Sequence, residues 1–308
     1  MTGTPRILVG RLAGLVTTLF AVLTFTFLLT FAVPQDPARA VLGPKATEAQ
    51  LAVVREQLGV DDPMVTQYVR YLGSIAQGDL GESYSQRAPV LDVIAGRLPY
   101  TMLLAAGALT FQLVVGIALG LLSAARAGGV VDRTGLAGSL IVIALPGFWM
   151  GLVLLYLFAY KWPIFPLGGK DLPLGLILPA VTLGLPGAAW TSRVMRASAY
   201  EVLSGDAVRG LRAKGLSPRT VLLKHTLRAA AGPVLTILAL DLGFFLGGAV
   251  LIESVFNWPG MGLASYQALQ QKDIPLLMGC VITGSVFILV LNLITDVVRT
   301  KVDPRVSL

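Results

Sequence analysis

Arg209-Gly-Leu-Arg-Ala-Lys-Gly-Leu-Ser-Pro218 is a basic segment, broken by turn-forming residues, between two apolar runs of membrane length. Its residue order predicts two short helices, of which the first ends at Lys214 and is stopped by Gly215 in a left-handed conformation. Ser217 is expected to cap the next helix, with Pro218 in its first turn. A membrane protein rarely carries a long basic loop without a partner for it, so we expect this helix–glycine–helix elbow to fit a cleft on a soluble protein.

The rest of the chain has the composition of a membrane protein. Hydrophobic residues make up 55% of the 308 residues and charged residues 13%, whereas a soluble domain is roughly 25% charged. The net charge of +7 does not indicate a nucleic-acid partner, because the basic residues gather at the ends of apolar runs, as membrane topology requires. The single cysteine, Cys280, lies inside an apolar run, which leaves no disulfide or cysteine-based metal site within one chain.

Runs of about 18 or more apolar residues predict transmembrane helices. The fourth run contains Pro179 and Pro186, which a membrane helix tolerates where its surroundings satisfy the freed carbonyl groups. The first run is longer than the roughly 7–15 residues of a signal-peptide core, so we expect a retained helix although Ala38-Arg39-Ala40 resembles a cleavage site. The six predicted spans are 12–33, 101–125, 136–160, 174–194, 233–256 and 275–298.

Basic residues of the short loops predict the orientation of these spans. One side holds Arg6 and Arg11, Arg126 and Arg133, the segment 193–228, and Arg299, Lys301 and Arg305. The other side holds Lys161, Lys170 and Lys272. The positive-inside rule therefore places both termini and the elbow in the cytoplasm, and segment 34–100 outside. We divide the chain into a tail and first helix (1–33), an external segment (34–100) and a membrane core (101–308) with a cytoplasmic loop at 195–232.

The external segment is predicted to be a small helical cap over the outer mouth. Thr47-Glu-Ala-Gln50 has the capping-box pattern and Gly59 can close the helix that follows it. A second helix is predicted from Asp62-Pro63, with one face formed by Val65, Tyr68, Leu72 and Ile75. Within the bilayer, the pairs Gly116/Gly120 and Gly243/Gly247 favour close helix packing.

The sequence lacks the side chains that an enzyme would need. His225 is the only histidine, so a histidine-based triad or zinc site has no second member. Gly168-Gly169-Lys170 lacks the first glycine and the following Ser or Thr of a phosphate-binding loop. Asp241 and Asp296 lie at different predicted depths, which excludes an intramembrane aspartyl enzyme. We expect no bound cofactor or metal on this chain, and any ATP and Mg²⁺ to be held by another chain.

Asp241 lies in the fifth predicted span, where an ionisable group normally faces a cavity or a partner. Two interpretations stay open. Asp241 either lines a solute path and meets a cationic group such as a peptide amine, or it hydrogen-bonds to Ser or Thr on a neighbouring helix.

Taken together, several motifs resemble the permease subunits of ATP-binding-cassette (ABC) importers, and more narrowly the first permease of the dipeptide/oligopeptide family, whose relatives also carry nickel. The resemblance covers nearly the whole chain. It departs from the family pattern at Gly210-Leu211, where small or hydroxyl residues are more usual, and at Pro34-Gln-Asp-Pro37. Besides the elbow, the matching motifs are Leu58-Gly-Val-Asp-Asp-Pro63, Gly78-Asp-Leu-Gly81, Lys224-His225-x-Leu-Arg228 with Pro233, Glu253-Ser-Val-Phe-Asn-Trp-Pro-Gly-Met-Gly262, Lys272-Asp273-Ile-Pro275, Asn292-x-x-x-Asp296 and Asp303-Pro-Arg305.

The resemblance implies an all-α membrane protein with a type I ABC-importer permease core, multi-pass in the bacterial cytoplasmic membrane. It implies half of a translocation pathway for short peptides, assembled with a homologous second permease, two cytoplasmic ATPases and an extracytoplasmic solute-binding protein. Nickel, haem-like or glutathione-type solutes are alternative substrates. A passive channel or an exporter component is the alternative from another class.

Two groups of residues follow as candidate sites. The loop 205–219 is expected to dock on the ATPase through Asp206, Arg209, Gly210, Leu211, Arg212, Ala213, Lys214, Gly215, Leu216, Ser217 and Pro218. The pathway or outer gate is expected to involve Asp241, Phe244, Phe245, Glu253 and Trp258. Three alternatives stay open: the elbow cations anchor lipid headgroups, Glu253 has a structural role at a helix end, and Trp258-Pro259 is a membrane-interface anchor and turn.

Overall fold

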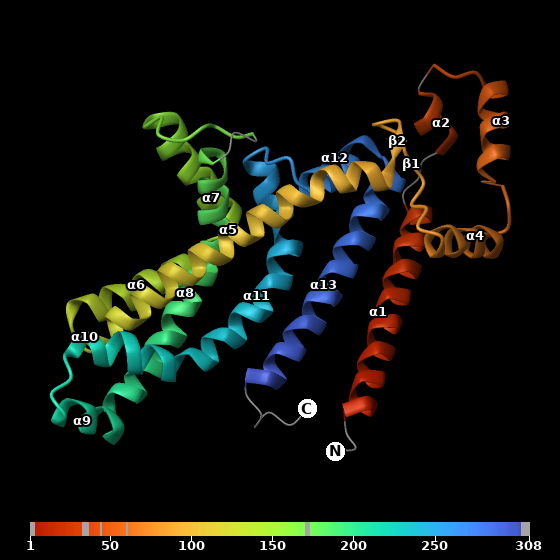
Figure 1. The fold of residues 1–308 in the computed structure, drawn as a ribbon. Helices are drawn as coiled ribbons and strands as arrows, with labels where there is room; N and C mark the ends of the chain where they lie inside the picture. The colour runs from red at the N-terminus through yellow and green to blue at the C-terminus, as the bar shows by residue number, and fades with distance from the viewer. Residues whose placement is uncertain (1–3, 33–36, 44, 60, 170–172, 303–308) are drawn as a thin grey trace. The chain divides into compact units, whose positions relative to one another are not determined.

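The computed structural model describes residues 4–32, 37–43, 45–59, 61–169 and 173–302, and almost all of them are helical (Figure 1). The Pro34-Gln-Asp-Pro37 segment lies largely outside these ranges. The elements before the membrane core are α1 (Thr4–Ala32), α2 (Pro37–Leu42), α3 (Glu48–Leu58), α4 (Met64–Ala76), and the short strands β1 (Glu82–Ser83) and β2 (Ala88–Pro89). Then follow α5 (Val90–Ala125), α6 (Val130–Ala144), α7 (Gly147–Leu155) with a π-helical end (Tyr156–Lys161), α8 (Leu174–Ser204), α9 (Asp206–Ala213), α10 (Pro218–Thr220) with a π-helical segment (Val221–Thr226), α11 (Leu227–Val255), α12 (Met261–Gln271) and α13 (Ile274–Val302).

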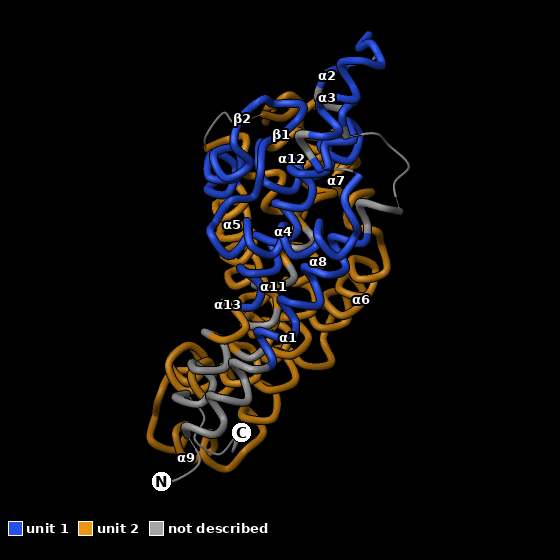
Figure 2. The backbone as a smooth tube through the Cα atoms, turned by 90° about the vertical axis from the view of Figure 1, so that its right-hand side faces the viewer, with its two compact units in different colours: residues 1–100, 259–289 blue, residues 101–258, 290–308 orange. Residues whose placement is uncertain are grey.

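The chain forms two compact units, coloured separately in Figure 2. The first contains residues 1–100 and 259–289, and the second contains residues 101–258 and 290–308. The chain thus leaves the first unit at residue 100 and returns to it at residue 259.

The core of the first unit joins the start of α5 to α12 and α13. Strands β1 and β2 form an antiparallel hairpin, with Glu82 opposite Pro89, that leads directly into α5. The buried residues of this core are Val90, Val93, Ile94, Met261, Ala264, Ala268, Leu276 and Cys280. The lone cysteine is therefore a buried packing residue.

Within residues 34–100 the predicted helices are confirmed. Thr47 and Gln50 form the reciprocal capping box of α3, and Gly59 ends that helix at φ +60°. Helix α4 begins after Pro63. Its Tyr68 packs on Phe27 of α1, with ring centroids 5.0 Å apart.

In the second unit α8 is central, packing against α6, α7 and α11. A seam of small residues brings α5 and α8 together. A Cβ added to Gly116 would lie 2.8 Å from Thr191, and one added to Gly120 would lie 2.6 Å from Met195. The predicted close packing at Gly116/Gly120 is confirmed, whereas the surroundings of Gly247 in the second pair lie outside the described residues.

Three of the described helices are long and apolar enough to cross a membrane, namely α5, α8 and α13 over Ile274–Leu293. Helix α8 runs unbroken through Pro179 and Pro186, and α5 begins at Val90, well before the predicted position 101. The apolar part of α1 within the range tested is Gly14–Leu28. The count of six spans and the inward-facing termini stay predictions.

The prediction of one continuous helix over 136–160 is wrong. Helices α6 and α7 pass the same test only as a pair, bent by 104° at their junction. Pro146 explains the break: it has no N–H to donate and disfavours helical backbone at the residue before it. Leu145 accordingly takes an extended conformation, with φ −87° and ψ 138°.

Candidate functional site

The elbow between α8 and α11 has the predicted backbone. Helix α9 ends in a Schellman motif, in which Gly215 N–H donates to the Arg212 carbonyl at 2.9 Å and Leu216 N–H donates to the Leu211 carbonyl at 3.3 Å. Gly215 has φ +80°, the left-handed conformation that favours glycine. Ser217 then caps α10, accepting from Thr220 N–H at 3.3 Å, with Pro218 in the first turn.

The two faces of α9 differ in chemistry. Val208 is buried, and α9 contacts α8 and the π-helical segment Val221–Thr226. The opposite face exposes the three cations, with Gly210 and Ala213 exposed between them. Arg209 pairs with Asp206 at 3.0 Å, but both side chains are largely exposed, so this pair contributes little stability. The elbow is thus anchored by apolar contacts and presents Arg209, Arg212 and Lys214 outward.

Asp241 belongs to a polar cluster that joins three helices of the second unit. Gln112 Nε2 on α5 donates to Asp241 Oδ2 on α11 at 2.5 Å and to Thr191 Oγ1 on α8 at 3.0 Å. Gln112 and Thr191 are completely buried. Gly187 makes room for the amide, since a Cβ there would lie 2.5 Å from Gln112 Oε1. This geometry supports the interpretation of Asp241 as an interhelical acceptor, although its donor is a glutamine and not Ser or Thr.

Gln112 was not among the predicted site residues. Its only signal was a single amide inside the apolar run 101–125, where a polar group needs a partner. Because that partner lies 129 residues away, spacing along the chain does not identify it.

The other predicted pathway residues lie inside the second unit. Thr101 Oγ1 on α5 donates to Glu253 Oε1 on α11 at 2.7 Å, and both side chains are completely buried. Phe245 is also buried, and the side chain of Phe244 lies outside the described residues. These contacts hold helices together, and a gate role for Glu253, Phe244 and Phe245 stays a prediction.

Trp258 tests one of the open alternatives. The turn after α11 is confirmed, with Asn257 at φ +46°, but the Trp258 side chain has no exposed surface. Trp258 N–H donates to the Glu253 carbonyl at 2.8 Å, which folds the chain back onto the end of α11. This burial argues against the alternative of a membrane-interface anchor, because such an anchor exposes its ring to lipid headgroups. A pathway role for Trp258 stays a prediction.

In the first unit, Asp273 is the acceptor that connects two distant motifs. Its Oδ2 accepts from Ser83 Oγ at 2.5 Å, Ser85 Oγ at 2.6 Å and Ser85 N–H at 2.9 Å. Its Oδ1 accepts from Leu276 N–H at 3.2 Å, at the start of α13. Burial by itself raises the pKa of the Asp273 carboxyl, but these hydrogen bonds outweigh it and hold the pKa below its ordinary value. The hairpin that follows the Gly78–Gly81 motif and the Lys272–Pro275 motif therefore form one structural joint.

An ion pair that was not among the predicted contacts joins buried Asp132 of α6 to half-buried Arg196 of α8. Arg196 binds Asp132 with two hydrogen bonds, 2.5 Å from Nε to Oδ1 and 2.7 Å from a terminal nitrogen to Oδ2. Gly128 N–H also donates to Asp132 Oδ2, at 2.9 Å. Asp132 is 2% exposed. The sequence reasoning used the arginines of this region only for topology, so it did not find a partner for one of them.

Comparison with known proteins covers nearly the whole chain. Residues 116–308 match the family described as binding-protein-dependent transport system inner membrane component, and residues 4–105 match the N-terminal region of such membrane components. The glutathione transport system permease protein GsiC of Escherichia coli K12 is 37% identical over 298 residues, which cover 97% of each chain. GsiC of Salmonella paratyphi A is 37% identical over 296 residues, 96% of this chain and 97% of the relative.

Among solved structures, the chain is similar to the inward-facing MetNI methionine ABC transporter. The TM-score is 0.57 at 17% identity, covering 68% of this chain and 96% of that chain. At this identity the similarity is one of fold, that of a type I importer permease.

Proposed function

The chain belongs to the family of binding-protein-dependent transport system inner membrane components and is a permease subunit of an ABC importer in the bacterial inner membrane, not an enzyme; from this premise we propose that its elbow, residues 205–219, docks on a cytoplasmic ATPase and drives half of a pathway for short peptides. The observation that carries this proposal is the elbow itself, a capped turn with a buried apolar anchor and three outward cations. Such a surface fits an acidic groove.

The position of the elbow in the chain supports a role in coupling. It joins α8 directly to α11, and these two helices pack against each other. They carry Thr191 and Asp241, which Gln112 bridges. A displacement of α9 would therefore be transmitted to the helices that hold the buried polar cluster. On this proposal the ATPases shift the equilibrium between the inward-facing and outward-facing states of the transporter. The helices of this chain are the part that changes position between those states.

The proposed assembly contains a second homologous permease, two ATPases that hold ATP and Mg²⁺, and an extracytoplasmic solute-binding protein. The proposed cargo is a short peptide. A second candidate is glutathione, itself a small peptide-like thiol, which is supported by the 37% identity to GsiC over 97% of both chains.

Docking is tested with variants of the elbow in the complete transporter, reconstituted in proteoliposomes. We expect Arg212→Glu and Gly215→Pro to abolish ATP-driven uptake and to lose the ATPase on purification, while the chain still inserts in the membrane. Arg126→Glu makes the same charge reversal outside the elbow and should keep most of the uptake. Wild-type uptake by Arg212→Glu, with the ATPase retained, would refute the docking proposal.

The cargo is tested by competition among labelled dipeptides, tripeptides and glutathione, using the wild-type assembly and Asp241→Asn. If Asp241 meets the amine of a peptide, Asp241→Asn should weaken uptake of peptides with a free amine and spare neutral analogues. An unchanged substrate profile would leave Asp241 with its interhelical hydrogen bond alone.

A further inference from the structure

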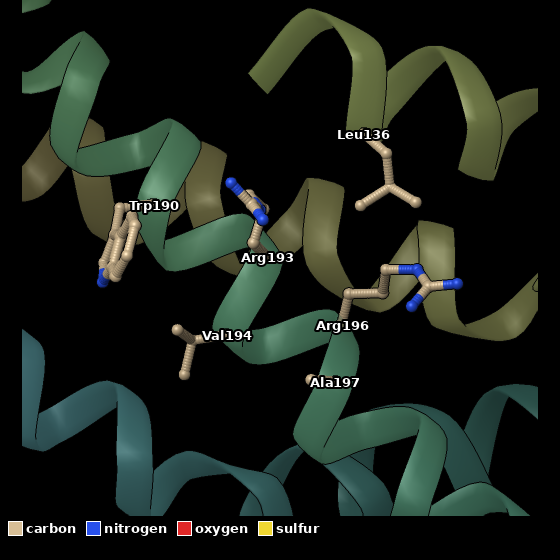
Figure 3. Close-up of a pocket in the computed structure, with 6 residues that line it drawn as sticks. All are labelled: Leu136, Trp190, Arg193, Val194, Arg196 and Ala197. Carbon is tan, nitrogen blue, oxygen red and sulfur yellow. The ribbon is translucent and has the colours of Figure 1, made fainter. Parts of the chain in front are cut away.

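A pocket of about 330 Å³ lies on the second unit beside the Asp132–Arg196 pair. Figure 3 shows Arg196 extending from α8 below Leu136 of α6, and Arg193 projecting from α8 between Trp190 and Leu136. The remaining lining residues, all on α8, are Trp190, Val194 and Ala197. The pocket thus combines two guanidinium groups with an aromatic ring and aliphatic side chains.

The two arginines of this pocket differ in how their charge is matched. Asp132 neutralises Arg196 and holds its guanidinium group in place, so Arg196 is a fixed part of the pocket lining. Arg193 has no carboxylate partner among the described residues, and its guanidinium carbon lies 5.9 Å from the centroid of the Trp190 ring. A cation held over an aromatic ring is positioned without being neutralised. Arg193 therefore leaves a positive charge available to an anion.

Along both helices, charged side chains are followed by exposed apolar side chains, as the charged headgroup of a phospholipid is followed by its acyl chains. The arginines lie in the half of α8 that leads into the elbow, and Leu136 lies at the middle of α6. One turn further along α6, Leu140 is 54% exposed, and Trp190, one turn back along α8, is 50% exposed. Charged groups thus lie toward the helix ends, while exposed apolar groups lie deeper along the same helices. Arginine and tryptophan are common at this membrane boundary.

We propose that this pocket binds the headgroup of an anionic phospholipid, with the phosphate on Arg193 and the acyl chains along Leu140 and Trp190. Charge complementarity selects this occupant. An apolar helix of a second subunit would bury the unmatched Arg193 without an anion, which is unfavourable. A free phosphate ion would leave the exposed apolar surface around the pocket uncovered. The proposal does not depend on the transported solute or on docking at the elbow.

The test uses the assembled transporter in phosphatidylcholine nanodiscs that contain a small fraction of photoactivatable phosphatidylglycerol. After irradiation, mass spectrometry measures labelling of the peptide that contains residues 190–197. We expect labelling in the wild-type protein that unlabelled phosphatidylglycerol reduces and added phosphatidylcholine does not. Arg193→Gln should lower it about fivefold, the effect of one basic residue at a membrane surface. Arg193→Lys, which keeps the charge, should retain most of the labelling.

The matched control is Arg133→Gln, an exposed arginine of α6 that does not line the pocket. Equal labelling in Arg193→Gln and Arg133→Gln would overturn the proposal, and so would equal labelling by a photoactivatable phosphatidylcholine in the wild-type protein. Displacement by glycerol phosphate in solution at matched ionic strength would show a simple anion site instead. A photoreactive residue at position 140 that crosslinks to the second permease and not to lipid would also reject the lipid as occupant. The wild-type competition needs no variant, so it decides even if Arg193→Gln is unstable.

Discussion

The α5–α8 seam and the α9–α10 elbow both depend on glycine, but for different physical reasons. In the seam a Cβ has no room, since one on Gly120 would lie 2.6 Å from the Ser192 carbonyl oxygen and one on Gly184 would lie 2.5 Å from that of Ala108. In the elbow, Gly210 and Gly215 have no atom within 4 Å of such a Cβ. Gly215 is required only by its backbone, at φ +80°.

The seam holds helices of the chain together, whereas the outer face of the elbow is the surface that we expect a partner to bind. Close approach of backbones fixes the seam, so a change there should act on folding. The elbow is fixed by its own caps and by the buried Val208, so a change on its outer face should act on binding and coupling. Stability and transport should therefore respond to different substitutions.

The largest effect is expected from Gly184→Leu in the seam. The side chain would meet the backbone of Ala108, which cannot move aside as a flexible side chain would, so we expect a loss of about 3 kcal/mol in unfolding free energy. Thermal unfolding of the purified complex would measure it. Gly138→Leu on α6, where a Cβ meets nothing within 4 Å, is the matched control. Equal stability of the two variants would end the steric interpretation of the seam.

A smaller effect is expected at Asp273, where hydrogen bonds and not glycines make the close contact. Asp273→Ala leaves Ser83, Ser85 and the start of α13 without their acceptor and should destabilise the first unit by roughly 2–3 kcal/mol. Asp79→Ala, which removes one exposed acceptor, should change stability far less.

Asp273 also predicts a pH dependence. Its pKa is lowered in the folded protein, so its contribution is complete above the ordinary aspartate pKa of about 3.9 and is lost as the pH falls through the lowered value. Unfolding temperatures measured from pH 6 down to pH 3 should fall less steeply below pH 4 in Asp273→Ala than in the wild-type protein. Parallel curves would contradict this role.

The next effect is local to the elbow. Gly215→Ala forces a Cβ into the left-handed region, at about 1–2 kcal/mol, so the Schellman motif should open more often. Hydrogen exchange of the backbone amides at positions 215 and 216 should speed up severalfold, and uptake should fall, while the unfolding temperature of the complex hardly changes. A large drop in that temperature would mean that the elbow belongs to the folded core.

The smallest effect is expected from Gly210→Ala. Alanine favours the helix by about 1 kcal/mol over glycine, and the position has open space around it. Hydrogen exchange of the backbone amides in α9 should slow, and uptake should stay within about twofold of wild type. If uptake were lost, Gly210 would have to touch the partner closely, and the outer face of α9 would then be sterically constrained as the seam is.

The sequence by itself determined the local structure and the family. The capping box at Thr47, the glycine stop at Gly215 and the cap at Ser217 were predictable because each depends on neighbours within a few residues, and the permease motifs extend along nearly the whole chain. The bend at Pro146 has a local cause that the prediction of one helix over 136–160 overlooked. Tertiary structure alone decided the burial of Trp258 and the pairings Gln112–Asp241, Thr101–Glu253 and Arg196–Asp132. Those pairings join residues 64 to 152 positions apart, and which polar groups meet inside an apolar bundle depends on helix rotation and packing, which no local pattern of residues encodes.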